Sequence, residues 1–474
     1  MLFNSLQFFI FFPIVTIFYF LLPHKFRVLC LLIASCIFYM VFIPKYLLIL
    51  AFTIVIDYFA GILIEKSEGA KRKLYLVISL ISNISILAIF KYFNFLAEVF
   101  YDISNLFSST SSGYSSILDI ILPIGLSFHT FQAMSYTIEV FRRKQKAERN
   151  FLIYSLYVMF YPQLVAGPIE RPQNLLHQFR EKHIFDSVRF WDGMRMIIWG
   201  LFIKTVIADR LAIVVDESYN HIDQQNALNL LIATVFFAFQ IYCDFAGYSS
   251  IAIGAAKVMG FTLMANFNMP YISKSIAEFW KRWHISLSTW FRDYLYIPLG
   301  GNRVKVHRWY FNLFFVFLVS GLWHGANWTF VIWGALHGFY LIVEILLKPL
   351  MNKIFNAKNS VSNFIRFQII ARFFTFLAVL FAWIFFRAAN VHEAFALIGK
   401  IIRWETQNPV YFPIQASELL FSFLLIIILL TIEFSGFKLI LKHNYQKAFY
   451  FFSLMFFIFL FGIFSDSQFI YFQF

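Results

Sequence analysis

Runs of apolar residues long enough to cross a lipid bilayer recur along almost the whole chain. A bilayer core needs roughly 20 apolar residues in helical form, because a helix rises only about 1.5 Å per residue. In lipid every backbone polar group must find a partner within the protein, which favours helices. We therefore expect an all-α polytopic membrane protein with about eleven to thirteen spans. The runs are 2–22, 27–44, 46–64, 74–95, 119–140, 190–215, 227–250, 309–323, 328–347, 367–386, 416–435 and 448–465.

The composition supports this expectation. The 474 residues are 60% apolar and 14% charged, whereas soluble domains carry roughly 25% charged residues. One core could not hide so much apolar surface from water, so lipid must be the solvent. The net charge of +14 would be compatible with nucleic-acid binding, but the basic residues lie in short loops between apolar runs. That distribution is the positive-inside pattern of a membrane protein, and we expect no nucleic-acid partner.

Loop charge also predicts the orientation, because Lys and Arg accumulate on the cytoplasmic side. Segments 65–73, 142–149 and 274–308 are basic, and the last has seven Lys or Arg against two acids. The first apolar run has no basic residue before it and is followed by Lys25. We therefore expect a first membrane span, not a signal peptide, with both termini on the periplasmic side. The sequence shows no repeat, soluble segment or linker, so 1–474 is expected to form one membrane domain.

Residues 278–294 carry the first set of side chains that could perform chemistry. Placed on a helix at about 100° per residue, they divide into a polar and an aromatic face. The polar stripe consists of Lys281, His284, Ser288 and Arg292. This stripe fits a site for an anionic ligand, and it fits equally well a surface helix that binds lipid phosphates. Arg303 and Lys305 add positive charge just beyond it, which suits a phosphate-bearing ligand entering from the cytosol.

A second set lies in residues 320–338. On one helix Ser320, His324 and Asn327 share a face with two glycines, and small residues there allow close helix packing and leave room for a tunnel. A histidine in such a dry setting can accept a proton from a hydroxyl. A lone intramembrane histidine more often bonds a neighbouring helix, and His337 fits that structural role better.

Residues 161–173 and two carboxylates complete the polar groups at membrane depth. Two prolines and a glycine forbid a plain helix in 161–173, which also supplies Arg171. We expect 151–168 and 270–300 to be re-entrant or interfacial. Asp244 and Asp57 lie within apolar runs, where pairing with Lys or Arg is the simplest explanation. The sequence contains no P-loop, dinucleotide fingerprint, metal-ligand cluster or serine elbow, so the histidines favour acyl transfer from a bound thioester.

Several long motifs together resemble the membrane-bound O-acyltransferase superfamily, and within it the bacterial branch that contains alginate and peptidoglycan O-acetyltransferases. They are LPIGLSFHTFQAMSYTIEVFR (122–142), YPQLVAGPIERPQNL (161–175), YCDFAGYSSIAIGAAKVMGF (242–261), FWKRWHISLSTWFRDYLYIPLGGNR (279–303), LWHGANWTFVIWGALHG (322–338), AWIFFRA (382–388) and FIYFQF (469–474). The resemblance covers nearly the whole chain. It implies a helical bundle around a central tunnel, with the acyl donor entering from the cytosol. One departure is His129, where the family pattern has tyrosine.

The resemblance also implies roles for single residues. The near-invariant histidine of the family falls on His324, the expected general base, and a second one falls on His284, expected to position or assist. The donor is expected to be acetyl-coenzyme A, with Lys281, Ser288, Arg292, Arg303 and Lys305 at its nucleotide and pyrophosphate. Ser320, Asn327, Asp244 and Arg171 are expected to support the tunnel. No permanently bound cofactor or metal is expected.

The implied function is transfer of acetyl across the bacterial inner membrane to an extracytoplasmic polysaccharide, through a periplasmic partner transferase. Richness in Phe, Ile, Asn and Lys favours an AT-rich genome, which favours peptidoglycan over alginate. Related subunits end in a similar aromatic segment, so Tyr471 is either a covalent acyl relay or an interfacial anchor. A transporter for a lipid-linked sugar is the alternative from another functional class, although the inverted repeat common in transporters is missing.

Overall fold

The computed structural model describes residues 1–105, 123–356, 361–435, 441, 443–464 and 469–470, and these residues contain helices but no strand. They divide into two compact units, which we describe separately. Unit 1 comprises Met1–Ile197 with Ser249–Met264, and unit 2 comprises Ile198–Tyr248 with Ala265–Phe474. The all-helical prediction is therefore confirmed for the described residues. The prediction of one domain over 1–474 stays a prediction.

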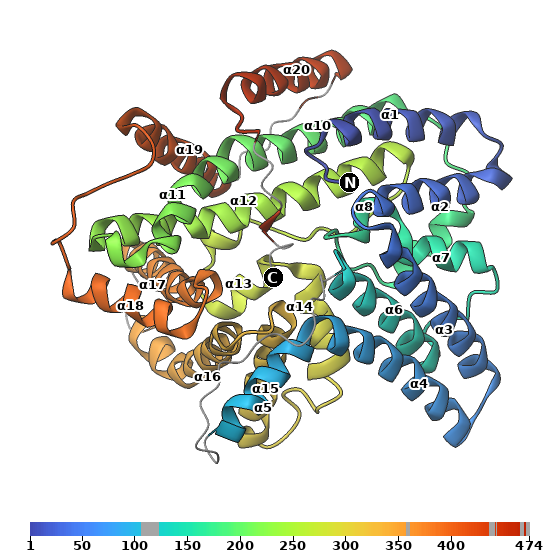
Figure 1. Ribbon diagram of the computed structural model, residues 1–474, viewed down its shortest axis with the longest axis horizontal. Coiled ribbons are helices and arrows are strands. Elements are labelled where there is room, and N and C mark those ends of the chain that lie inside the picture. The colour runs from blue at the N-terminus through green and yellow to red at the C-terminus, as the bar shows by residue number, and fades with distance from the viewer. Residues whose placement is uncertain (106–122, 357–360, 436–440, 442, 465–468, 471–474) are drawn as a thin grey trace. The chain divides into compact units, whose positions relative to one another are not determined.

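Unit 1 is built from the N-terminal helices, coloured blue to green in Figure 1. Its elements are α1 (Leu6–Leu21), α2 (His24–Met40), η1 (Pro44–Tyr46), α3 (Leu47–Lys66), α4 (Gly69–Leu87), η2 (Ala88–Tyr92), α5 (Phe93–Asn105), α6 (Leu126–Phe141), α7 (Phe151–Met159), α8 (Tyr161–Leu164), α9 (Pro172–Leu175), η3 (His177–Arg180) and most of α10 (Ser187–Phe202). The break between α7 and α9 confirms that 161–173 is not a plain helix.

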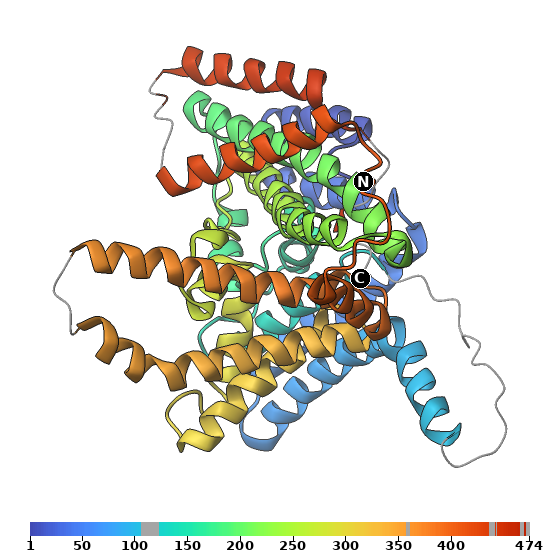
Figure 2. The ribbon, with the colours of Figure 1, turned by 90° about the vertical axis from the view of Figure 1, so that its left-hand side faces the viewer.

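Unit 2 contains the remaining helices, and Figure 2 shows α16 and α17 running side by side. Its elements are η4 (Ile203–Ala208), α11 (Asp209–Asn220), η5 (Ile222–Gln224), α12 (Ala227–Met259, whose last turns belong to unit 1), η6 (Pro270–Ile272), α13 (Ile276–Arg282), α14 (Ile285–Phe291), η7 (Arg292–Tyr296), α15 (Val306–His324), α16 (Trp328–Asn356), α17 (Val361–Arg387), α18 (Val391–Arg403), α19 (Ala416–Ser435) and α20 (Asn444–Phe461).

The surface and interior have the polarity expected of a protein that lipid surrounds. Among the described residues, six helices are long and apolar enough to cross a membrane, and the shorter α1 is also apolar. Large apolar side chains lie on the outside: Leu48, Phe100 and Phe459 are 73%, 75% and 78% exposed. Water would oppose such exposure, whereas lipid tails do not. The multi-pass prediction is confirmed, and each predicted apolar run carries a helix.

Inside unit 1, the surroundings of Asp57 contradict the prediction that it pairs with Lys or Arg. Its carboxylate, on α3, is fully buried and accepts hydrogen bonds from Ser79 Oγ at 2.6 Å and Asn83 Nδ2 at 2.9 Å. Both partners lie on α4. The expected Lys or Arg is therefore replaced by a hydroxyl and an amide, because neutral donors can satisfy a buried carboxyl without adding a second buried charge.

In unit 2, glycines bring α15 and α16 into close contact. A Cβ on Gly321 would lie 2.2 Å from the carbonyl oxygen of Phe330, and a Cβ on Gly334 would lie 2.3 Å from that of Phe317. The obstructing atoms belong to backbone and cannot rotate away. The expected single helix over 320–338 is wrong, because the chain turns at 325–327 and the two glycines face each other across a helical hairpin.

We expect Gly321→Ala to lower the thermal unfolding midpoint of the purified protein, since overpacking typically costs about 1–3 kcal/mol. Gly399→Ala is the matched control, because a Cβ there would meet only the flexible end of Arg403, at 3.1 Å. Alanine is the better helix former, so the control is expected to keep or slightly raise the midpoint. Equal midpoints for both variants would contradict the close-packing interpretation.

Candidate functional site

The predicted helix over 278–294 is interrupted at its centre. The prediction of one polar stripe along a single helix is therefore wrong. α13 ends at Arg282, Trp283 is extended, and His284 takes a left-handed conformation with φ 44°. The reason is tertiary: the preceding segment captures backbone groups that a helix would use. Asn268 N donates to the carbonyl of Arg282 at 2.9 Å, and Ile285 N donates to the carbonyl of Asn266 at 2.8 Å.

His284 is thereby turned into the protein interior, where it is fully buried. Its Nδ1 lies 3.1 Å from Asn266 Oδ1, which also accepts a hydrogen bond from Ser286 Oγ at 2.9 Å. Since an amide oxygen only accepts, Nδ1 carries the hydrogen and Nε2 holds the lone pair that can take a proton. Burial lowers the pKa of His284 to about 3, so the ring is neutral at physiological pH.

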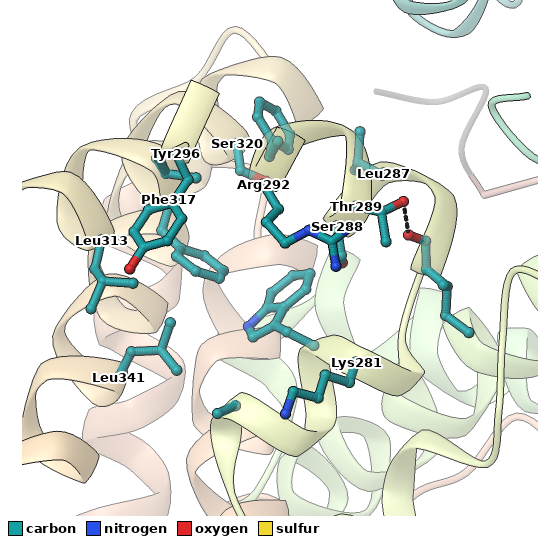
Figure 3. Close-up of a pocket in the computed structure, with 15 residues that line it drawn as sticks. Lys281, Leu287, Ser288, Thr289, Arg292, Tyr296, Leu313, Phe317, Ser320 and Leu341 are labelled. Carbon is teal, nitrogen blue, oxygen red and sulfur yellow. Dashed lines mark hydrogen bonds between the residues drawn. The ribbon is translucent and has the colours of Figure 1, made fainter. Parts of the chain in front are cut away.

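The other members of the stripe line a cavity of about 410 Å³. Lys281 reaches it from α13, Ser288 from α14, Arg292 from the π-helix η7 and Ser320 from α15 (Figure 3). The Arg292 side chain extends toward Ser288 and forms an ion pair with Asp293 at 2.8 Å. The remaining wall is largely apolar, with Trp280, Phe291, Leu313, Phe317 and Leu341. Two cations and four hydroxyls, those of Ser288, Thr289, Tyr296 and Ser320, in an apolar wall can bind a ligand that is part anionic and part apolar.

Arg303 and Lys305 do not line this cavity. Both are exposed on the turn that precedes α15. His284 and His324 are also outside its lining. The structure therefore brings together Lys281, Ser288, Arg292 and Ser320, and it separates them from the other predicted donor contacts.

His324 is the last residue of α15 and is 4% exposed. Its ring packs edge-on against Trp323 and Trp333, each with centroids 4.9 Å away, and against Phe386 at 5.3 Å. His284 also contacts Trp323, at 6.2 Å between centroids. The two predicted catalytic histidines thus lie against the same indole ring, in surroundings that exclude water.

His337 takes the structural role expected of it. Its Nδ1 accepts a hydrogen bond from Trp280 Nε1 at 3.2 Å. Trp280 is part of the cavity wall, so His337 orients a wall residue from behind. Asn327 is structural as well: its Oδ1 accepts the N–H of Thr329 at 3.0 Å and its Nδ2 donates to the carbonyl of Ala389 at 2.9 Å, which caps the start of α16.

Asp244 confirms the expected pairing with a cation. Its Oδ1 lies 2.5 Å from the Nζ of Lys204, a lysine that the sequence interpretation had not singled out. An ionisable residue inside the apolar run 190–215 is a signal that could have identified Lys204.

Asn266 was also missed, and no local pattern marks it, because its partner His284 is 18 residues away. Arg171 belongs to unit 1, and Tyr471 lies outside the described residues.

Comparison with known proteins decides the family. The model of the membrane-bound O-acyltransferase family matches residues 78–385, which include His284, His324 and the cavity. The chain belongs to the membrane-bound O-acyltransferase family. It is therefore an acyltransferase, and the predicted family and enzyme class are confirmed.

Three named acyltransferases are similar to this chain, two of them over most of its length. The probable alginate O-acetylase AlgI of Pseudomonas aeruginosa is 39% identical over 86% of the chain and 76% of its own length. The peptidoglycan O-acetyltransferase of Helicobacter pylori is 34% identical over 89% of the chain and 83% of its own length. The teichoic acid D-alanyltransferase of Bacillus subtilis is 29% identical, over 46% of the chain and 58% of its own length.

Proposed function

We propose that this acyltransferase takes acetyl from cytosolic acetyl-coenzyme A and passes it across the inner membrane, for O-acetylation of an extracytoplasmic polysaccharide. The cavity of unit 2 is the observation that carries the proposal. Lys281 and Arg292 suit the phosphates of the donor, and the apolar wall suits its pantetheine arm and acetyl group. Arg303 and Lys305 remain predicted contacts of the nucleotide, outside the cavity lining.

His324 is the proposed general base. Buried among aromatic rings, it can accept a hydroxyl proton where water does not compete. His284 is the proposed assisting residue, because Asn266 holds its Nδ1 and leaves Nε2 as the basic nitrogen. Together they can move a proton from the attacking hydroxyl to the departing thiolate.

Tyr471 is the proposed first acceptor of the acetyl group. In this step the phenol oxygen attacks the thioester carbonyl, His324 takes the phenol proton, the C–S bond breaks, and coenzyme A leaves as the thiol after receiving that proton. A phenol has a pKa near 10, so its acetyl ester is more activated than an alkyl ester and can pass the acetyl onward. A periplasmic partner transferase then moves it to the polymer. Peptidoglycan is the favoured polymer, and an alginate-like polysaccharide is the next candidate.

The purified chain in proteoliposomes, supplied with acetyl-labelled acetyl-coenzyme A, tests the proposal. We expect label to leave the thioester, with coenzyme A released, at a rate that depends on the protein. A transporter of lipid-linked sugars would leave acetyl-coenzyme A intact, and that result would favour the alternative.

Arg292→Ala is expected to weaken acetyl-coenzyme A binding roughly ten- to 150-fold, because a hydrogen bond to a charged group contributes about 1.5–3 kcal/mol. Titration calorimetry on the detergent-solubilised protein measures the dissociation constant. Arg308→Ala is the matched control, since Arg308 is an exposed cation on α15 that does not line the cavity. Equal loss of affinity in both variants would assign the effect to surface charge and not to the cavity.

The proposed orientation places the basic segment 274–308 in the cytosol. A cysteine at position 305, on an exposed turn, should react with a membrane-impermeant maleimide only in inverted vesicles or permeabilised cells. Replacement of Cys30, Cys36 and Cys243 beforehand removes competing thiols. Labelling of position 305 in intact cells would reverse the orientation and with it the side of donor entry.

A further inference from the structure

The end of the described chain in unit 2 returns to the interior along η4, α11 and α12. The amide of Ile463 donates to the carbonyl of Thr205 at 2.9 Å, and Arg210 donates to the carbonyl of Phe461 at 2.8 Å. Phe469 and Ile470 are then only 2% and 4% exposed. Such burial of an apolar C-terminal pair in the protein, and not in lipid, requires a specific receiving surface.

That surface contains a buried ionic cluster of Lys204, Asp209 and Asp244. Lys204 Nζ lies 2.7 Å from Asp209 Oδ1 and 2.5 Å from Asp244 Oδ1, and the three side chains are 2%, 3% and 3% exposed. Lys204 lies in the π-helix η4, a geometry that recurs at functional sites. Two carboxylates against one lysine leave one excess negative charge, so further hydrogen-bond donors stabilise the cluster.

The C-terminal segment supplies such a donor. The backbone N–H of Ile470 donates to Asp244 Oδ2 at 2.6 Å, so the two oxygens of Asp244 serve two different partners. Phe469 covers the same place: its ring lies 4.7 Å from Lys204 Nζ and packs edge-on against Tyr248 at 4.5 Å. Asp244 and Tyr248 are one turn apart on α12 and therefore share a face.

The same part of α12 reaches the candidate site. Phe245, next to Asp244, packs its ring edge-on against His284 with centroids 4.7 Å apart. His284 in turn contacts Trp323, against which His324 also packs. Helix α12, which holds the C-terminal segment, thus also contacts His284.

We propose that Asp244 and Lys204, within this cluster, form a socket for the C-terminal segment, in which Asp244 is a positioning residue for the acyl transfer. The socket fixes the chain at Ile470, one peptide unit before Tyr471. Its role in catalysis rests on the proposed function of Tyr471, whereas its role in holding Phe469 and Ile470 does not.

The chain offers a matched pair of variants. An asparagine at position 244 has one oxygen and cannot serve both Lys204 and Ile470, whereas an asparagine at position 209 keeps an oxygen for Lys204 and leaves the bond from Ile470 N–H to Asp244 in place. Each substitution removes one carboxylate charge from the same lysine at the same burial. A difference between Asp244→Asn and Asp209→Asn therefore reports the C-terminal segment, and a shared defect reports the fold.

The test is the maleimide labelling rate of the full-length protein in detergent, with Cys30, Cys36 and Cys243 replaced by alanine and a single reporter introduced by Ile470→Cys. We expect slow labelling in this parent, a rise of at least about tenfold with Asp244→Asn, and a rate within about twofold of the parent with Asp209→Asn. Fast labelling in the parent, no rise with Asp244→Asn, or an equal rise in both variants would each overturn the socket.

Measurements of acetyl delivery distinguish the proposed socket from the proposed acyl relay through Tyr471. Without the reporter, Asp244→Asn is expected to slow acetyl delivery to polymer while the dissociation constant of acetyl-coenzyme A stays unchanged. If the labelling result holds but Tyr471→Phe delivers acetyl normally, the socket stands and the relay fails. If Tyr471→Phe abolishes delivery while Asp244→Asn changes neither labelling nor delivery, the relay stands and the socket fails.

Discussion

His324→Ala is expected to lower the acetyl-transfer rate by about 10²–10⁴-fold, the usual cost of losing a general base. The dissociation constant of acetyl-coenzyme A should stay close to that of the wild type, because His324 does not line the cavity. Single-turnover measurements with labelled donor separate the two quantities. The aromatic rings around His324 remain in the variant, so the protein is expected to fold and insert.

His337→Ala is the control for this prediction. His337 lies in the same aromatic cluster, 5.0 Å from Trp333 between ring centroids, and is buried like His324. Its loss should have a mild effect, through the orientation of Trp280. His284→Ala should be damaging without abolishing transfer. Wild-type turnover in His324→Ala would refute the assignment, and equal losses in all three variants would indicate a folding defect.

Tyr471→Phe is expected to abolish delivery of acetyl to polymer, because the variant keeps the aromatic ring but lacks the oxygen that would form the ester. In the wild type without its periplasmic partner, mass spectrometry should find one added acetyl group on the C-terminal peptide. The same peptide of Tyr471→Phe should carry none.

Tyr445→Phe is the matched control, since Tyr445 is another aromatic hydroxyl near the C-terminus and is 70% exposed. It should deliver acetyl at the wild-type rate. Full polymer acetylation by Tyr471→Phe would leave Tyr471 the role of an interfacial anchor. The conclusion about Tyr471 does not depend on whether the cavity binds the donor. The donor-binding experiment with Arg292→Ala tests the cavity separately.

The apolar runs predicted where most of the long helices lie, because a lipid-exposed segment must satisfy its own backbone and can do so only as a helix. Helices α7 and α18 lie outside those runs. The pairing of Asp244 with a cation followed from the cost of a bare buried charge. The residues Lys281, Ser288 and Arg292 could be grouped from their spacing, and the cavity brings them together even though the helix that was assumed is interrupted.

Tertiary structure decided what local pattern could not. Segment 266–268 captures backbone groups of 282–285 and thereby breaks the predicted helix and turns His284 inward, an effect of residues distant in sequence. Gly321 and Gly334 meet only because the chain reverses at 325–327, so their close approach has no signature in a single helical face. Sequence thus determined which segments are apolar enough for a membrane and which kinds of side chain are available. The three-dimensional packing determined which of them meet, because hydrogen bonds between distant segments compete with the local helix and win where burial makes an unsatisfied group costly.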